Sequence, residues 1–143
     1  MKEIQTIATA QNFSTINIGQ LNQLGEYELH LGPNVIIPGK VFGGAALHAT
    51  GGDFSFQVFP TDTETGFLHT HKNHEELYFF LRGKGEFQVD GQVFSVEEGS
   101  VVRGSCRQTL GAQQRHRTTC NALRAIPWQH VHGRRCRRCG HTE

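Results

Sequence analysis

Several features are scarce or missing in this sequence, and each absence narrows what the chain can be. No apolar run approaches the length of a membrane span, and the mean hydropathy is -0.43, so we expect a soluble chain with no membrane partner. The N-terminus lacks the basic and apolar regions of a signal peptide, which favours the cytoplasm. No nucleotide-binding loop, Ser-His-Asp arrangement or Cys-His nucleophile pair is visible.

Lysine is absent from residues 104–143, and cysteine is absent from residues 1–105. Residues 1–103 hold four lysines and two arginines against 12 acids, a net charge of −6. Residues 104–143 hold eight arginines against one acid, a net charge of +7, together with all four cysteines. Two halves this different rarely belong to one folded barrel. Because the chain is read as cytosolic, a disulfide framework is not expected.

Short runs in which apolar and polar residues alternate, separated by turn residues, make up most of the chain, and helical periodicity is almost absent. A period of two over Asp53–Phe59 predicts a strand, and so does Glu76–Arg82, which is apolar on both faces and therefore reads as buried. The Asp-Gly pair at 90–91 predicts a two-residue hairpin that places Phe87 opposite Phe94. Strands at this spacing indicate an all-β barrel.

The most informative stretch pairs two histidines with a carboxylate. His69 and His71 are two residues apart, so on a strand both imidazoles point to one face. If residues 72–75 form a polar turn, the following strand runs back antiparallel and brings Glu76 to the same point. Two neutral imidazoles and one carboxylate are a standard ligand set for a divalent transition metal with open positions. Iron, manganese, nickel, copper and zinc all accept these ligands, so the identity of the metal stays open.

This spacing resembles the first signature motif of the cupins. The residues in step with the motif are His69, His71, Glu76 and Gly83. The leading glycine of the motif has no match, because its position falls on Thr63. The resemblance covers roughly residues 35 to 103 and implies a double-stranded β-helix, or jelly-roll, cupin barrel.

The cupin resemblance implies a metal-dependent enzyme acting on a small polar or aromatic molecule, by oxidoreductase (dioxygenase-type), isomerase or decarboxylase chemistry. Tyr78 or Phe80 could line the pocket, and Tyr78 is a candidate catalytic residue, since its hydroxyl can donate a proton or a hydrogen bond. His74 is read as an exposed turn residue. A non-enzymatic cupin that stores or senses a small ligand is the alternative. Because an open barrel edge invites pairing, we also expect a homodimer.

The second signature motif of the cupins fails. Started at Gly99, it places its proline on Ser105 and its histidine on Leu110. The alternating pattern also stops near Arg103, so the barrel is expected to be incomplete at its C-terminus. We therefore divide the chain into an N-terminal arm, a cupin barrel and an atypical, poorly ordered tail, at residues 1–25, 26–103 and 104–143.

Three interpretations of the tail stay open. The leading one is translation out of frame, because arginine codons of the CGN set, read one base on, become codons for the small, apolar and acidic residues that barrels use. The second is a zinc module, in which Cys136, Cys139 and His141 form one knuckle and the arginines contact nucleic acid. The third is a disordered basic tail. The leading interpretation involves no nucleic-acid partner.

Overall fold

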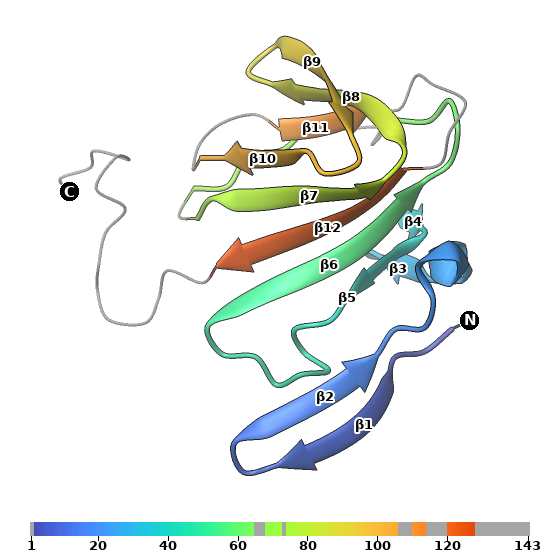
Figure 1. Cartoon of the computed structure of the whole chain (residues 1–143), viewed down its shortest axis with the longest axis vertical. Coiled ribbons are helices and arrows are strands. Elements are labelled where there is room, and N and C mark those ends of the chain that lie inside the picture. The colour runs from blue at the N-terminus through green and yellow to red at the C-terminus, as the bar shows by residue number, and fades with distance from the viewer. Residues whose placement is uncertain (1, 65–67, 73, 106–109, 114–119, 128–143) are drawn as a thin grey trace, which may run out of the picture.

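The computed structural model describes residues 2–64, 68–72, 74–105, 110–113 and 120–127, the last two ranges by their backbone (Figure 1). The described elements are strands together with one short 3-10 helix, η1 (Leu21–Glu26). The strands are β1 (Gln5–Ala10), β2 (Phe13–Asn17), β3 (Glu28–His30), β4 (Ile36–Pro38), β5 (Lys40–Phe42), β6 (Gly52–Phe59), β7 (Glu76–Arg82), β8 (Lys84–Val89), β9 (Gln92–Glu97), β10 (Val101–Gly104), β11 (Leu110–Gln113) and β12 (Cys120–Pro127). The expected all-β fold is confirmed. No helix in these ranges has the length and hydrophobicity that crossing a membrane requires.

Two larger sheets carry the barrel, and two hairpins are attached to it (Figure 1). The five-stranded sheet has the order β10-β7-β12-β6-β5, and the three-stranded sheet has the order β11-β8-β9. The chain passes from the first sheet to the second at Gly83, between β7 and β8, where the backbone has φ +92°. Only glycine adopts that conformation without a steric penalty. The glycine that closes the cupin-like motif is therefore the residue at which the chain changes sheets.

Strand β12 occupies a central place in the five-stranded sheet. It runs antiparallel to both of its neighbours: Ala122 lies opposite Gln57 on β6 and opposite Phe80 on β7. The expectation that strands end near Arg103 is therefore wrong, and β11 also lies beyond that residue. The cause is that β6 and β7 each present backbone groups that a strand must satisfy, whatever side chains it carries. The proposed frame shift is not tested, and the candidate zinc knuckle at 136–141 lies outside the described residues.

The strand expected at Glu76–Arg82 and the hairpin expected at Asp90-Gly91 are both present. Strand β7 spans Glu76–Arg82, the residues that the alternation predicts, and its odd-numbered and even-numbered side chains face opposite ways. Phe87 on β8 pairs with Phe94 on β9, as expected. The turn between them has φ +48° at Asp90 and φ +82° at Gly91. Positive φ at both central residues is the backbone of a type I′ turn, whose twist suits a two-residue hairpin.

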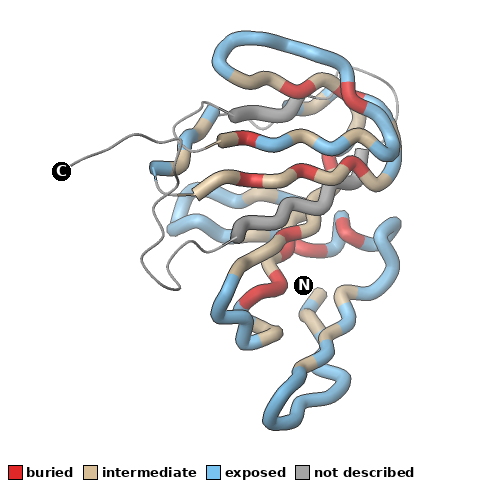
Figure 2. Tube along the Cα trace, turned by 60° about the vertical axis from the view of Figure 1, so that its left-hand side comes forward, coloured by how far each residue is buried: buried red, intermediate tan, exposed pale blue. Residues whose placement is uncertain are grey.

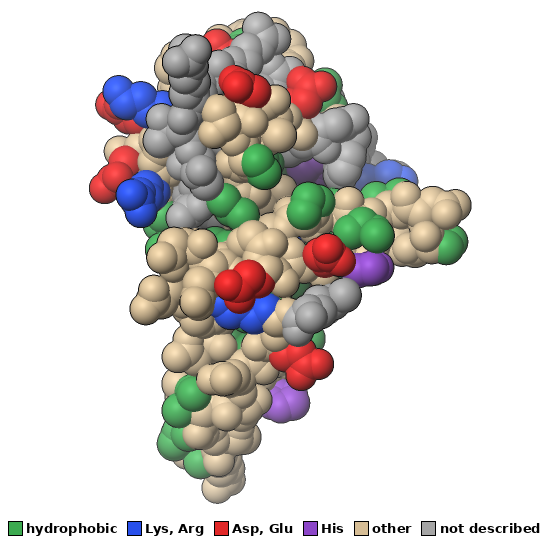
Figure 3. Space-filling view, turned by 90° about the vertical axis from the view of Figure 1, so that its right-hand side faces the viewer, with side chains coloured by type: hydrophobic (Ala, Val, Ile, Leu, Met, Phe, Trp, Pro, Cys, Tyr) green, Lys and Arg blue, Asp and Glu red, His purple; other side chains and the backbone are tan. Residues whose placement is uncertain are grey.

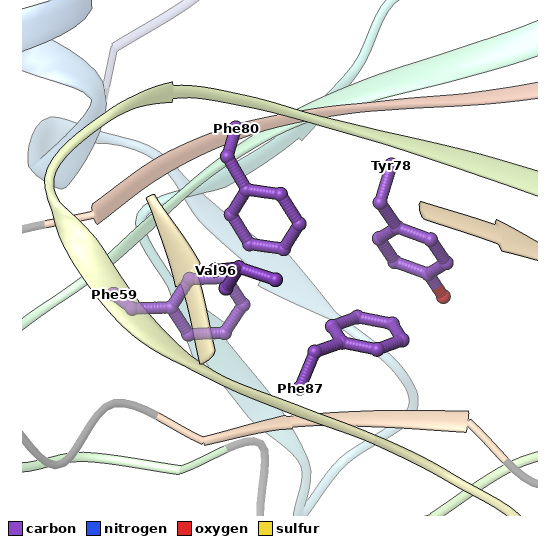
Figure 4. Packing of buried hydrophobic residues seen from close by; sticks show 5 residues of the cluster. All are labelled: Phe59, Tyr78, Phe80, Phe87 and Val96. Carbon is purple, nitrogen blue, oxygen red and sulfur yellow. The ribbon is translucent and has the colours of Figure 1, made fainter. Parts of the chain in front are cut away.

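The buried side chains form two separate hydrophobic clusters. The first, called here the barrel cluster, consists of Phe59, Tyr78, Phe80, Phe87 and Val96, whose side chains point toward one another (Figure 4). The second, called here the N-terminal cluster, consists of Leu24, Tyr27 and Val41, with Phe56 and Val58 of β6 packed against it. Strand β6 thus contributes to both clusters through its two faces. Burial is concentrated in the barrel strands, whereas the β1–β2 hairpin is almost wholly exposed (Figure 2).

Candidate metal site

The three predicted ligands come together at the start of β7. Glu76 is the first residue of that strand, and His69 and His71 lie in the segment that leads to it. The expected strand through the two histidines is absent from residues 68–72, where His69 forms a single β-bridge. The expected hairpin with β7 is therefore wrong. The reason is that β10 and β12 occupy both edges of β7, so the preceding segment has no free edge to pair with.

The ligand atoms lie at separations that suit one metal ion. His71 Nε2 is 2.6 Å from Glu76 Oε1, and His69 Nε2 is 3.3 Å from Glu76 Oε2. One ligand atom from each of the three residues lies within 4.8 Å of the others. Atoms bound to one ion at about 2.1 Å are at most about 4.2 Å apart, so only a small side-chain adjustment is needed to hold it. The donor set therefore fits a divalent transition metal.

Glu76 is the buried centre of this group. Its side chain is fully buried, while about a quarter of each histidine side chain is exposed. A carboxylate taken out of water is costly unless it is paired, and here both imidazoles contact it. Tyr78, two residues along the same face of β7, donates a hydrogen bond from its hydroxyl to Glu76 Oε2. Burial raises the pKa of Tyr78, so the hydroxyl remains a donor at neutral pH.

The site opens into a cavity of about 440 Å³. His69, His71 and Tyr78 line one part of its wall, while Glu76 is buried behind them. The volume lies within the range of about 300–1,000 Å³ that small-molecule sites occupy. The two histidines thus face a space that a small ligand could fill.

Phe80 and His74 lie near the metal candidates but outside the three-residue group. Phe80 is 3% exposed and belongs to the barrel cluster; it is not among the side chains that line the cavity. Of the two residues that the sequence offers for the pocket lining, Tyr78 lines the cavity and Phe80 does not, because Phe80 lies two residues further along β7, in the core. His74 stacks beside His71, with ring centroids 4.1 Å apart, and stands outside the three-residue metal group.

Sequence reasoning missed the rest of the cavity wall. Leu29 and Ile37 of the β3–β4 hairpin line it, and so do Lys40 on β5 and Gln57 on β6. These residues are 12 or more positions away from His69 in the sequence and share no motif with it. Their alternating pattern predicts strands, but it does not predict that β3 pairs with β4 and β5 with β6, which brings Leu29 opposite Ile37 and Lys40 opposite Gln57.

Comparison with known families agrees with this geometry. A family model described as the cupin domain matches residues 55–119. The chain carries a cupin domain. The match includes all three metal candidates and continues past Arg103, as strands β11 and β12 do. No curated protein sequence matches the chain.

Solved structures show the same fold. A cupin protein from Bacteroides fragilis is 21% identical, with a TM-score of 0.61, over 73% of this chain and 86% of that one. A predicted oxalate decarboxylase from Thermotoga maritima is 24% identical, with a TM-score of 0.53, over 59% of this chain and 72% of that one. A cupin 2 conserved barrel domain protein from Salinispora arenicola is 16% identical, with a TM-score of 0.52, over 72% and 74%. At these identities the likeness establishes the double-stranded β-helix and leaves the activity open.

Proposed function

We propose that this cupin domain binds a divalent transition metal through His69, His71 and Glu76 and acts on a small molecule in the adjoining cavity. The observation that carries the proposal is the fully buried carboxylate of Glu76, contacted by two imidazoles at a cavity wall. A buried, paired ionisable side chain beside a cavity is typical of a functional site. A match to the cupin family supports the same proposal.

The residues of the chain have distinct parts in this proposal. A metal held there would act as a Lewis acid on an oxygen-bearing substrate, which suits oxidoreductase, isomerase or decarboxylase chemistry. Glu76 supplies the anionic ligand, and the buried barrel cluster behind it keeps water from competing for its oxygens. Tyr78 orients the carboxylate through its hydrogen bond, so we assign it the role of a positioning residue and not that of a catalytic residue.

Elemental analysis of the purified chain tests the metal site. We expect one equivalent of transition metal in the wild type and none in the His69→Ala/His71→Ala variant. His30→Ala is the matched control, because His30 is a partly exposed histidine outside the site, and it should keep the metal. Metal that persists in the double variant would mean that the metal-binding site lies elsewhere, at the cysteines of residues 106–139. A wild type that takes up no metal would overturn the proposal.

A non-enzymatic cupin that stores or senses a ligand is the second candidate, and the mostly apolar cavity lining favours it. Metal-dependent oxygen uptake or product formation would support the enzyme. Tight ligand binding without product would support the binder. A homodimer and a cytoplasmic location remain predictions.

A further inference from the structure

The cavity has a second wall that the metal site does not use. The β3–β4 hairpin supplies it: Leu29 and Ile37 lie opposite each other in register, and both line the cavity. Ile36, also at the cavity, is 52% exposed. Exposed hydrophobic side chains gather in a band across the face shown in Figure 3. A large apolar surface left open beside a polar site is one that an apolar ligand can cover.

The wall of the same cavity includes one lysine, Lys40, and one acid, Glu64. Lys40 on β5 pairs in register with Gln57 on β6, and both line the cavity. The Lys40 ammonium lies 5.4 Å from the centre of the Phe42 ring, which keeps it beside the lining. Strand β5 is three strand spacings from β7 in the sheet, so the two strands lie about 14 Å apart across the sheet. The register of the intervening strands places Lys40 level with Phe80, four residues along β7 from Glu76.

We propose that the ligand is an elongated amphiphile with a metal-chelating oxygen pair at one end, an apolar body, and a carboxylate at the other end. The head group would meet the metal at His69, His71 and Glu76. The body would cover the β3–β4 hairpin, and the carboxylate would reach Lys40. The head-group part rests on the proposed function, because a chelating group needs the metal, whereas the other two contacts belong to the cavity itself.

Three hydroxamates test the proposal on the metal-loaded full chain: acetohydroxamate, octanohydroxamate and suberic monohydroxamate. Calorimetry should show that octanohydroxamate binds at least tenfold more tightly than acetohydroxamate, and that the terminal carboxylate of the suberic compound adds a further severalfold. Ile36→Asp should abolish the chain-length preference, and Lys40→Met should abolish the carboxylate preference. Equal affinity for the three probes would overturn the proposal.

Matched variants separate these effects from general damage. Ile7→Asp changes an isoleucine that is 59% exposed on β1, and Lys84→Met removes an exposed lysine on β8 that pairs with Glu97. Both should leave the two preferences intact. If Ile36→Asp fails to fold, as judged by circular dichroism, Leu29→Ala takes its place and should reduce the chain-length preference. Loss of the preferences in the control variants as well would contradict the assignment to this cavity.

The metal-free protein distinguishes failure of this inference from failure of the proposed function. Saturation-transfer NMR with acetate, octanoate and suberate needs no metal. A preference for the longer acids that Ile36→Asp removes would support the cavity inference even if elemental analysis finds no metal. Bound metal without any such preference would overturn the inference and leave the metal site standing. If Ile36→Asp turns a dimer into a monomer without changing the preference, a second copy covers the hairpin instead.

Discussion

The two tyrosines of the chain lie in different hydrophobic clusters, and their hydroxyl groups donate to different kinds of acceptor. Tyr78, in the barrel cluster, donates to the carboxylate of Glu76. Tyr27, in the N-terminal cluster, donates to the backbone carbonyl of Ile18 at 3.0 Å, with the carbonyl of Glu3 at 3.3 Å. Burial raises the pKa of both hydroxyls, and the charge of Glu26 adds to this at Tyr27. Both therefore remain donors at neutral pH.

The comparison separates the part of the molecule that supports the site from the part that only holds the chain together. In the barrel cluster, the Phe87 ring packs edge-on against Tyr78, with centroids 4.8 Å apart, so core packing orients a side chain that touches a metal candidate. In the N-terminal cluster, Tyr27 ties the first residues to the barrel through backbone carbonyls. We therefore expect damage to the first cluster to reach the metal and damage to the second to reach only the stability of the fold.

The largest effect is expected from Phe87→Ala. Phe87 is fully buried between Tyr78 and Phe80, and truncating such a side chain costs about 3–5 kcal/mol of unfolding free energy through lost burial and the cavity left behind. Because the cavity forms beneath Tyr78, metal affinity should fall as well. Urea unfolding and metal titration measure the two effects.

Leu24→Ala is the partner experiment in the N-terminal cluster. Leu24 is equally buried, and its truncation should cost about 2–5 kcal/mol while the folded fraction keeps its metal affinity. Equal losses of metal affinity in the two variants would show that the clusters are energetically one unit, which would break the comparison.

An intermediate effect is expected from Tyr78→Phe. The ring stays in the barrel cluster, but Glu76 loses the hydroxyl that orients it. Removing the hydrogen-bond partner of a ligand typically lowers metal affinity by about 10–100-fold. Competition with a calibrated chelator measures this. Unchanged affinity would mean that the two imidazoles alone hold the carboxylate in place.

The smallest effect is expected from Tyr27→Phe. The loss of a hydrogen bond to a backbone carbonyl should lower the unfolding free energy by about 1 kcal/mol. Metal affinity should not change, because Tyr27 belongs to the other cluster. The same chelator competition and urea titration used for Tyr78→Phe give a direct comparison, and a loss of metal affinity here would contradict the separation of the two regions.

Much of the fold and of the candidate site could be predicted because the signals are local. The apolar residues on both faces of Glu76–Arg82 predict a buried strand, and the structure has one there. The Asp-Gly pair at 90–91 predicts a tight turn with positive φ at two consecutive residues, which is also present. The three metal candidates were recognisable because their residue types and short spacing carry the chemistry. The cavity wall was not recognisable, because Lys40 and Ile37 reach the site only through the pairing of separate strands.

Strand β12 is a strand that the side-chain pattern did not predict. Its segment carries neither the composition nor the cupin motif expected of a barrel strand, yet its backbone lies between β6 and β7. Sequence by itself determined the strands with strong alternation, the tight turn, and the two histidines and carboxylate that suit a metal. Only the tertiary structure decided that the histidines reach Glu76 without a hairpin and which distant residues share their cavity. The physical reason is that backbone hydrogen bonding between neighbouring strands depends on which edges are open, and that is a property of the whole sheet.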